Sequence, residues 1–495
     1  MAESSRYIPF TPADPNDFDI RATRNATVDA LDSSVRRVHR HPSSRAGVYI
    51  GSAGTILMDW VVSSLPDISM KPPSSLAFSM SISPTHSGAQ TSFLETSVGP
   101  ATLMLIQQLR NVHSGRGEIK SETWEPCIGL VTDALYFAIN EELDALGDGC
   151  EVLYGRAGLL YALLRLRDEV GKLALSKEQL AQPVVEAILA VSADASIRSL
   201  VDDIVARGIE GAGSYAEELH SDERRLAPPL MWSWHGKRYL GGAHGVAGIL
   251  QMLISAPKHL LVDHWDMIVR TISWLVDIQL PSGNWPSKAG RHMFKKVEED
   301  ERDQLIQWCH GATGTLILLS TLLRKFSSQS TSATTSSSTH RSLGVPETLV
   351  SSARKALASG GDLVYTHGLL RKGVGLCHGV AGSVFALLAV SDALSSPISP
   401  GPTPSTQGQH AVVIDQYFFY AIHLSQLALS YETLTQRGDM RVPDRPYSLY
   451  EGLAGMCCAW AEVVKRLDRV LQGQAHRNTI MGSGMPGYDD LGDLE

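Results

Sequence analysis

The 495-residue sequence contains no long apolar run and no excess of positive charge. No stretch of about 18 uninterrupted apolar residues points to a membrane-spanning helix, and the N-terminal MAESSRYIPFTPADPNDF lacks the apolar core of a signal peptide. Alanine at position 2 excludes the N-myristoylation pattern. The net charge of -9 provides no basic surface for nucleic acid or for an anionic membrane. These absences predict a cytoplasmic protein with no transmembrane segment and no nucleic-acid partner.

Cysteine is also scarce, with six in the whole chain. In a reducing compartment, so few cysteines are more often buried thiols or metal ligands than disulfides. Each one taken alone is best interpreted as a buried thiol. The six are Cys127, Cys150, Cys309, Cys377, Cys457 and Cys458.

What the sequence does contain is a repeated box. Its pattern is Gly-x-x-Gly, usually with alanine in third place, followed by about ten mostly apolar residues. The segments after the boxes, such as LLYALLRLRDEV and TLILLSTLLRKF, show no alternation and often finish with charge, which indicates helices. Further helical stretches lie between the boxes, so the repeating unit is a pair of helices. The boxes start at Gly51, Gly155, Gly245, Gly311, Gly379 and Gly452, with a degenerate copy, TSVG, at Thr96.

Seven helix pairs stacked side by side cannot leave an apolar face open at each end of the stack. Closure into a ring removes both ends, so we predict an all-α fold, an α/α toroid with an inner and an outer layer of helices. An open solenoid is the alternative, but solenoids usually carry polar caps and a more regular spacing. Glycine at a helix entrance lets the chain turn sharply and lets neighbouring helix ends approach closely.

The expected toroid covers residues 46–472, after an N-terminal arm (1–45) and before a flexible C-terminal tail (473–495). Two stretches inside it, near 327–342 and 395–410, are too polar and too rich in residues that break helices to pack in a core. We expect both to be disordered insertions that emerge on one rim of the ring.

Two boxes are preceded by cysteine and histidine. Cys309 stands two residues before Gly311, and Cys377 and His378 directly precede Gly379. Because the helix entrances of a ring converge on one mouth, the two sulfurs and the imidazole would meet there. Two thiolates and one imidazole are a zinc donor set with one position left open for substrate or water. The alternative is that both cysteines are reduced packing residues.

In this order, the motifs YGRAG, AHGVAG, PSGNWPS, WCHGATG, GLCHGVAG and YSLYEGLAG resemble the lanthionine synthetase C-like family in its eukaryotic branch. The resemblance covers roughly residues 48–467. It implies a double ring of seven inner and seven outer helices and one zinc ion held by Cys309, Cys377 and His378. Bacterial members of the family add a peptide cysteine to dehydroalanine or dehydrobutyrine. Eukaryotic members bind glutathione and are implicated in adding it to dehydroamino acids in damaged proteins.

The chemistry of such a site agrees with thiol activation. A free thiol has a pKa of about 8.5, and zinc coordination deprotonates it near neutral pH. The thiolate attacks the β-carbon of an unsaturated residue, and the α-carbon then needs a proton. His244 matches the family's active-site histidine and is the candidate for this proton transfer; a helix-capping histidine is the alternative. By the same resemblance, Glu151 would orient His244 or the substrate, and His310 would assist proton transfer or donate a supporting hydrogen bond.

Other positions favour glutathione over a cyclising peptide. Bacterial members carry an arginine four residues before the first zinc cysteine, where this chain has Leu305, which puts the ring-closing reaction in doubt. Arg6, Lys372, Arg441 and Asp444 match positions that contact glutathione in the eukaryotic branch. Glutathione carries two carboxylates and one ammonium, so basic side chains and one acid suit its charge pattern. Each basic residue taken alone would be interpreted as a solvated surface group.

The sequence therefore predicts a zinc-dependent enzyme that forms C–S bonds. It would add glutathione, or a cysteine thiol, to dehydroalanine or dehydrobutyrine residues in peptides or proteins and form a thioether. The alternative is a non-catalytic regulatory or adaptor protein that binds zinc and glutathione. A glycosidase on an α/α toroid is a third hypothesis. It would need a pair of carboxylates on the inner rim, and the boxes are expected to supply none.

Overall fold

The computed structural model describes residues 6–15, 18–68, 87–115, 119–142, 149–290, 305–327, 343–394, 414–475 and 482–494. Within these ranges the secondary structure is helical, and β-type pairing is limited to isolated bridges. Each of the seven boxes leads directly into a helix, as the sequence predicts. The box helices are α2 (Ser52–Val62), α3 (Val98–Ser114), α5 (Arg156–Leu173), α9 (Val246–Ser255), α11 (Ala312–Phe326), α13 (Val380–Leu394) and α16 (Leu453–Leu471).

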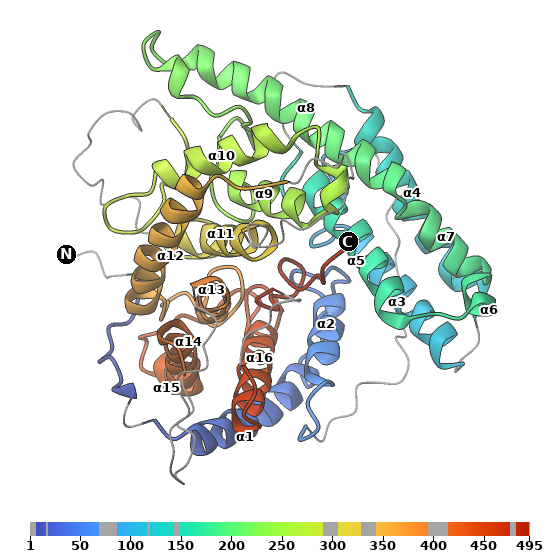
Figure 1. Ribbon diagram of the computed structural model, residues 1–495. Helices are drawn as coiled ribbons and strands as arrows, with labels where there is room; N and C mark the ends of the chain where they lie inside the picture. The colour runs from blue at the N-terminus through green and yellow to red at the C-terminus, as the bar shows by residue number, and fades with distance from the viewer. Residues whose placement is uncertain are drawn as a thin grey trace, which may run out of the picture.

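These seven helices form a closed inner ring (Figure 1). Each packs on the next in chain order, and the last, α16, packs on α2 again. Most residues of the inner helices are buried, and in α9 all 10 residues are. A helix that is buried all round needs neighbours on every side, and a closed ring inside an outer layer supplies them. The predicted α/α toroid is confirmed.

The outer layer consists of helices that cover this ring. Its members in the described ranges are α1 (Ile20–His39), α4 (Ser121–Asn140), α7 (Pro183–Val191), α8 (Asp194–Glu218), α10 (Trp265–Asp277), α12 (Glu347–His367) and α14 (Gln416–Leu427). Beside them lie the short helices α6 (Lys177–Leu180) and α15 (Tyr431–Gln436) and the 3₁₀ turns η2 (Arg224–Leu226), η3 (Lys258–Leu260) and η5 (Ala428–Ser430). The outer helices are not distributed one to each inner helix, because α7 and α8 both precede α9 and none is described between α2 and α3.

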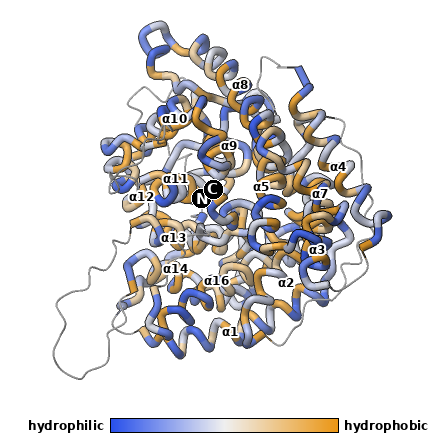
Figure 2. Tube along the Cα trace, turned by 45° about the vertical axis from the view of Figure 1, so that its right-hand side comes forward, coloured by the Kyte–Doolittle hydropathy of each residue, from blue (hydrophilic) through white to orange (hydrophobic). Residues whose placement is uncertain are grey.

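Helix α1 belongs to this outer layer, so the segment expected to form an N-terminal arm (residues 1–45) contributes one helix to the layer around the ring. Leu31, Val35 and Val38 are buried, and their spacing of three to four residues forms an apolar face that packs on α16. Figure 2 shows hydrophilic and hydrophobic residues alternating along α1, as expected for a helix with one buried face. Arg24 Nε donates to Asp468 Oδ1 at 2.8 Å, which ties the start of the helix to the last inner helix.

The loops that precede the inner helices also close on one another. A backbone N–H in the loop before one box donates to a carbonyl in the loop before the next box, and the series returns to its start. The donor–acceptor pairs are Tyr49 to Leu94, Ser92 to Tyr154, Leu153 to Ala243, Gly242 to Trp308, Cys309 to Cys377, Cys377 to Tyr450, and Tyr450 to Tyr49. The seven helix entrances therefore meet at one end of the ring, and this end is called the mouth below.

The second glycine of each box lies against the carbonyl of the residue six positions earlier. A Cβ atom on Gly158 would stand 2.3 Å from the Val152 oxygen and 2.5 Å from the Ser92 Cβ atom. Atoms in a close-packed interior cannot approach so closely unless the backbone moves. The degenerate box has lost its first glycine to Thr96 but keeps the second as Gly99, and its helix still takes its place in the ring.

Helix α5 offers a matched test of this packing. We expect Gly158→Ala to lower the free energy of unfolding by about 1–3 kcal/mol, because the added methyl group overpacks the loop. Gly171→Ala in the same helix meets nothing within 4 Å and should raise stability by up to about 1 kcal/mol, because alanine favours the helix. Urea midpoints of the two variants measure this difference. Equal midpoints would rule out the packing explanation.

The end of the chain was expected to be a flexible tail, but residues 482–494 lie inside the ring (Figure 1). Met485 and Tyr488 are fully buried, and the Tyr450 hydroxyl donates to the Pro486 carbonyl at 2.9 Å. Acidic residues near the end also have partners, because Tyr161 Oη donates to Asp490 Oδ1 at 2.7 Å. The composition of this segment is typical of a surface tail, and only the groups inside the ring make its burial favourable.

The two predicted Ser/Thr/Pro-rich insertions, near 327–342 and 395–410, lie outside the described residues apart from Ser327. Among the residues that the structure describes, no helix has both the length and the apolar composition needed to cross a bilayer.

Candidate metal centre and the mouth of the ring

The residue immediately before each box lines the mouth. At the six complete boxes this residue is partly exposed, while the residues on either side of it are buried. The ring of loop hydrogen bonds explains the pattern, because it holds every loop in the same orientation relative to its helix. The residues in this position are Ile50, Tyr154, His244, His310, His378 and Glu451, with Glu95 before the degenerate box.

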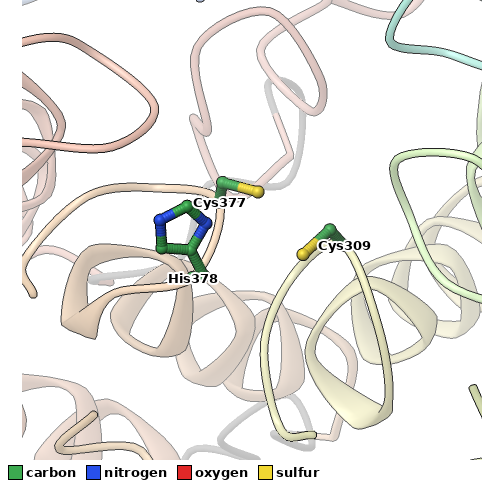
Figure 3. Close-up of side chains that lie close together, drawn as sticks. All are labelled: Cys309, Cys377 and His378. Atoms are coloured by element: carbon green, nitrogen blue, oxygen red, sulfur yellow. The ribbon is translucent and has the colours of Figure 1, made fainter. Parts of the chain in front are cut away.

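Cys309, Cys377 and His378 meet at this mouth (Figure 3). Their ligand atoms all lie within 4.8 Å of one another, and the Cys309 N–H donates to the Cys377 carbonyl at 3.4 Å. Both sulfurs are buried. The donor atoms of a tetrahedral zinc site are about 3.3–3.8 Å apart, so small side-chain rotations would bring this set into zinc geometry. The convergence expected from the sequence is present, and the donor types fit zinc.

The two thiols are electrostatically unequal. The hydrogen bond from Cys377 lowers the pKa of Cys309, and the positive charge of Lys372 adds to this effect. Burial raises the pKa of Cys377, and the neighbouring Cys309 sulfur raises it further. Gln307 Nε2 donates a second hydrogen bond to the Cys309 sulfur at 3.2 Å. Cys309 is therefore the thiol of the pair that ionises more readily, and the thiolate is the form that binds a metal cation.

His244 is held by a buried carboxylate. Its Nδ1 lies 3.1 Å from Oε2 of Glu151, which is 1 % exposed. The same carboxylate accepts the backbone N–H groups of Leu153 and Tyr154, both at 2.7 Å. Burial raises the pKa of Glu151, whereas its bonds to His244 and to the two amides lower it. This contact fixes the imidazole through Nδ1 and leaves Nε2 available for proton transfer.

The ring of Tyr239 lies between the side chains of His244 and His310. Its ring centroid is 5.9 Å from that of His244 and 5.4 Å from that of His310, and His310 directly follows Cys309. The candidate proton-transfer residue and the candidate metal ligands therefore lie around the same mouth.

Backbone pairing brings the predicted basic residues to one side of the mouth. The Arg371 N–H donates to the Arg6 carbonyl at 3.1 Å, and the Arg441 N–H donates to the Arg371 carbonyl at 2.7 Å. Lys372 follows Arg371 and is close enough to Cys309 to affect its pKa. Arg6, Lys372 and Arg441 are all exposed, and Asp444 is exposed three residues further along the last of these segments.

A family model for lanthionine synthetase C-like proteins matches residues 116–469. The chain belongs to the lanthionine synthetase C-like family. The protein named glutathione S-transferase LANCL1 from Danio rerio is 25% identical over 316 residues, which are 64% of this chain and 59% of that protein. The LanC-like protein GCL1 from Arabidopsis thaliana is 28% identical over 333 residues, which are 67% of this chain and 59% of that protein. The chain thus matches 59% of the length of each relative.

Among solved structures, nisin cyclase aligns with a TM-score of 0.45 and 14% identity, over 90% of this chain and 94% of that chain. The family predicted from the boxes is confirmed, and both curated relatives come from eukaryotes, as the predicted branch requires.

The sequence motifs of the lanthionine synthetase C-like family did not point to Tyr49. Its side chain is buried and stacks on Tyr450, with ring centroids 4.8 Å apart, and its hydroxyl hydrogen-bonds to the Cys377 sulfur. Tyr49 stands two residues before its box, which is the position that Cys309 and Cys377 occupy in theirs. This register is the signal that could have identified it.

The expectation that no box supplies a pair of rim carboxylates is wrong. Glu95 and Glu451 both precede a box and both line the mouth. They affect each other, because the negative charge of Glu451 raises the pKa of Glu95. In this member of the lanthionine synthetase C-like family, the mouth therefore combines acidic and basic side chains with a group that could hold a metal ion.

Glu95 gives a pH-dependent prediction. Burial, followed by the charge of Glu451, raises its pKa from 4.5 to about 7. Between these two pH values the folded protein binds more protons than the unfolded chain, so its stability falls as the pH rises from about 4.5 through about 7. Glu95→Gln should therefore be more stable than the parent at pH 8, and this gap should close at pH 4.5. Urea midpoints at the two pH values measure it, with Glu186→Gln on α7 as the control for loss of an exposed charge. A gap of the same size at both pH values would contradict the assignment.

Proposed function

We propose that this protein adds the thiol of glutathione to dehydroalanine or dehydrobutyrine residues in peptides or proteins, and that zinc activates the thiol. The observation that carries the proposal is that a possible metal-binding group and an acid–base pair lie at the same mouth. Cys309, Cys377 and His378 form a metal-binding set with room for a further ligand. The His244–Glu151 pair forms an acid–base group beside it.

A zinc ion held by the three ligands would supply the positive charge that keeps a thiol deprotonated near neutral pH. The two carboxylates of glutathione suit Arg6, Lys372 and Arg441, and its ammonium suits Asp444. The name of the Danio rerio relative includes glutathione S-transferase activity, which supports this choice of thiol.

The reaction needs one proton to move. A new S–C bond forms at the β-carbon, the C=C π bond breaks, and the hydrogen lost by the thiol reappears on the α-carbon. His244 Nε2 is suited to deliver that proton, because Glu151 holds the opposite nitrogen of the ring. His310, which directly follows Cys309, would assist by hydrogen bonding near the reacting atoms.

The test combines purified protein, glutathione and a peptide that contains one dehydroalanine, and it detects the thioether adduct by mass spectrometry. We expect adduct above the uncatalysed background, loss of this activity after zinc is removed with a chelator, and recovery when zinc is restored. If glutathione binds but the adduct stays at background with zinc present, the protein is the zinc- and glutathione-binding regulator and the enzymatic proposal is wrong.

We also propose that the protein acts in a reducing compartment, namely the cytoplasm. All six cysteines are free thiols, and both the metal centre and the glutathione chemistry require reduced sulfur.

A further inference from the structure

A tight hairpin carries Trp234 to the edge of the mouth. Trp234 and Lys237 exchange backbone hydrogen bonds of 2.8 and 3.1 Å, and the two residues between them, His235 and Gly236, have φ values of 50° and 66°. Two positive φ values define a type I′ turn. Residues other than glycine seldom adopt this left-handed conformation, although histidine does so more often than most.

The hairpin is anchored on both sides. Trp232 is buried and its Nε1 donates to the Ile204 carbonyl of α8 at 2.9 Å. Its ring fills the space beside Gly208, where a Cβ atom would stand 2.6 Å away. On the other side, Arg238 binds Glu218 through two hydrogen bonds of 2.8 and 2.9 Å. The position of Trp234 is therefore fixed before any ligand arrives, which lowers the entropy cost of binding.

The indole of Trp234 is nearly parallel to two other rings at the mouth. It lies 5.8 Å from the His244 ring with planes 3° apart, and 5.7 Å from the Tyr154 ring with planes 12° apart. The rings of Tyr154 and His244 are 6.1 Å apart and 14° from parallel. All three side chains are partly exposed. They present flat faces in one common orientation, beside the imidazole that Glu151 holds.

We propose that Trp234 and Tyr154 form the subsite that binds the planar dehydroamino-acid unit of the acceptor peptide. The inference rests on the proposed function. A dehydroamino acid is flat, because its C=C bond is conjugated with the following carbonyl and joined to an amide, and flat π systems stack on aromatic faces. The subsite lies beside His244, the candidate source of the proton that the α-carbon needs.

The positions of these residues around the ring place the proposed sites for glutathione and for the acceptor peptide apart. Tyr154 precedes α5, whereas Lys372 lies in the loop before α13, three positions further round the ring of seven inner helices. The thiol donor and the acceptor therefore bind on different sides of the metal centre. Addition of the thiol makes the α-carbon tetrahedral, so the product no longer lies flat on the aromatic faces and binds less tightly than the acceptor.

Binding without glutathione tests the subsite independently of catalysis. The probes are a short peptide with one dehydroalanine and the same peptide with alanine in its place, titrated calorimetrically. We expect the parent to bind the dehydroalanine peptide about two- to tenfold more tightly than the alanine peptide, as stacking of one planar group provides. Trp234→Ala should lose this preference, and Trp234→Phe should retain part of it. Equal preference in the parent and in Trp234→Ala would overturn the proposal.

Kinetics and a matched control separate this inference from the proposed function. Trp234→Ala should raise the KM for the dehydroalanine peptide while zinc content and glutathione affinity stay at parental values. Trp124→Ala removes a partly buried tryptophan on α4 and should leave the preference intact. If the parent shows the preference but forms no adduct, the subsite stands and the enzymatic proposal fails. If the parent forms adduct and Trp234→Ala keeps its KM and its preference, the enzyme stands and the subsite is wrong.

Discussion

Cys377→Ala is expected to purify with almost no zinc, whereas the parent carries close to one ion per chain. The substitution leaves one sulfur and one imidazole, and two ligands from a set of three cannot satisfy a tetrahedral ion. It also removes the partner whose hydrogen bond lowers the pKa of Cys309, so the remaining sulfur is less ready to bind a cation. Elemental analysis of the purified proteins measures the loss, and formation of the glutathione adduct should fall to background with it.

Cys457→Ala is the matched control for this experiment. Cys457 is also a fully buried free thiol, but it lies in α16 and belongs to no group of metal ligands among the described residues. Both variants lose a buried sulfur, so any general effect of repacking should appear in both. Parental zinc content in Cys377→Ala, or no zinc in the parent, would refute the metal centre.

Replacement of His244 should lower the rate of adduct formation about 10²–10⁴-fold, because positioned acid–base groups contribute rate factors of this size. His244→Asn is the preferred variant. Its amide N–H can still donate to Glu151, so the buried carboxylate keeps a partner while the imidazole is lost. Zinc content and glutathione affinity should stay at parental values, since neither depends on the imidazole. Mass-spectrometric initial rates at saturating glutathione provide the measurement.

Two further variants, Glu151→Gln and His264→Asn, serve as comparisons for His244→Asn. The glutamine keeps the shape of Glu151 but loses its charge, and we expect a smaller loss of about 10–100-fold. His264 also pairs with a carboxylate, Asp202 at 2.6 Å, and its side chain is 19% exposed, against 20% for His244. His264→Asn should react at the parental rate. Adduct formation by His244→Asn at the parental rate would remove His244 from the mechanism.

The ring itself could be predicted because its essential contacts are local in sequence. The second glycine of each box packs against a carbonyl six residues earlier. The contact that requires glycine is therefore visible in a short stretch of sequence. Even the degenerate copy keeps Gly99, and the helix after it occupies its place. Glycine spacing therefore predicted the seven inner helices and the mouth at which they meet.

The two ends of the chain could not be predicted in this way. Helix α1 is stabilised by α16, and Arg24 pairs with Asp468 across 444 positions of the sequence. The last residues look like a solvated tail until Tyr161 and Tyr450 supply hydrogen bonds inside the ring. Neither the contact of α1 with α16 nor the hydrogen bonds to the C-terminal segment produce a repeated pattern in the nearby sequence.

The residues of the candidate site also fall into two groups, those that the sequence could predict and those that it could not. The candidate metal ligands and His244 could be named because they stand at fixed positions before boxes, within motifs that resemble the family. Tyr49, whose hydroxyl hydrogen-bonds to the Cys377 sulfur, precedes a box that lies outside the family motifs, and Trp234, which reaches the mouth on a hairpin, precedes no box. Their roles depend on which loops the ring brings together.

The sequence by itself determined the helical ring, the family and the residue types available for thiol chemistry, because glycine spacing and box motifs are properties of short segments. Only the tertiary structure decided that Glu151 lies 3.1 Å from Nδ1 of His244, that the C-terminal segment lies inside the ring and that three aromatic rings lie nearly parallel at the mouth. Those relations join side chains up to several hundred positions apart, and closure of the ring sets the distances between them.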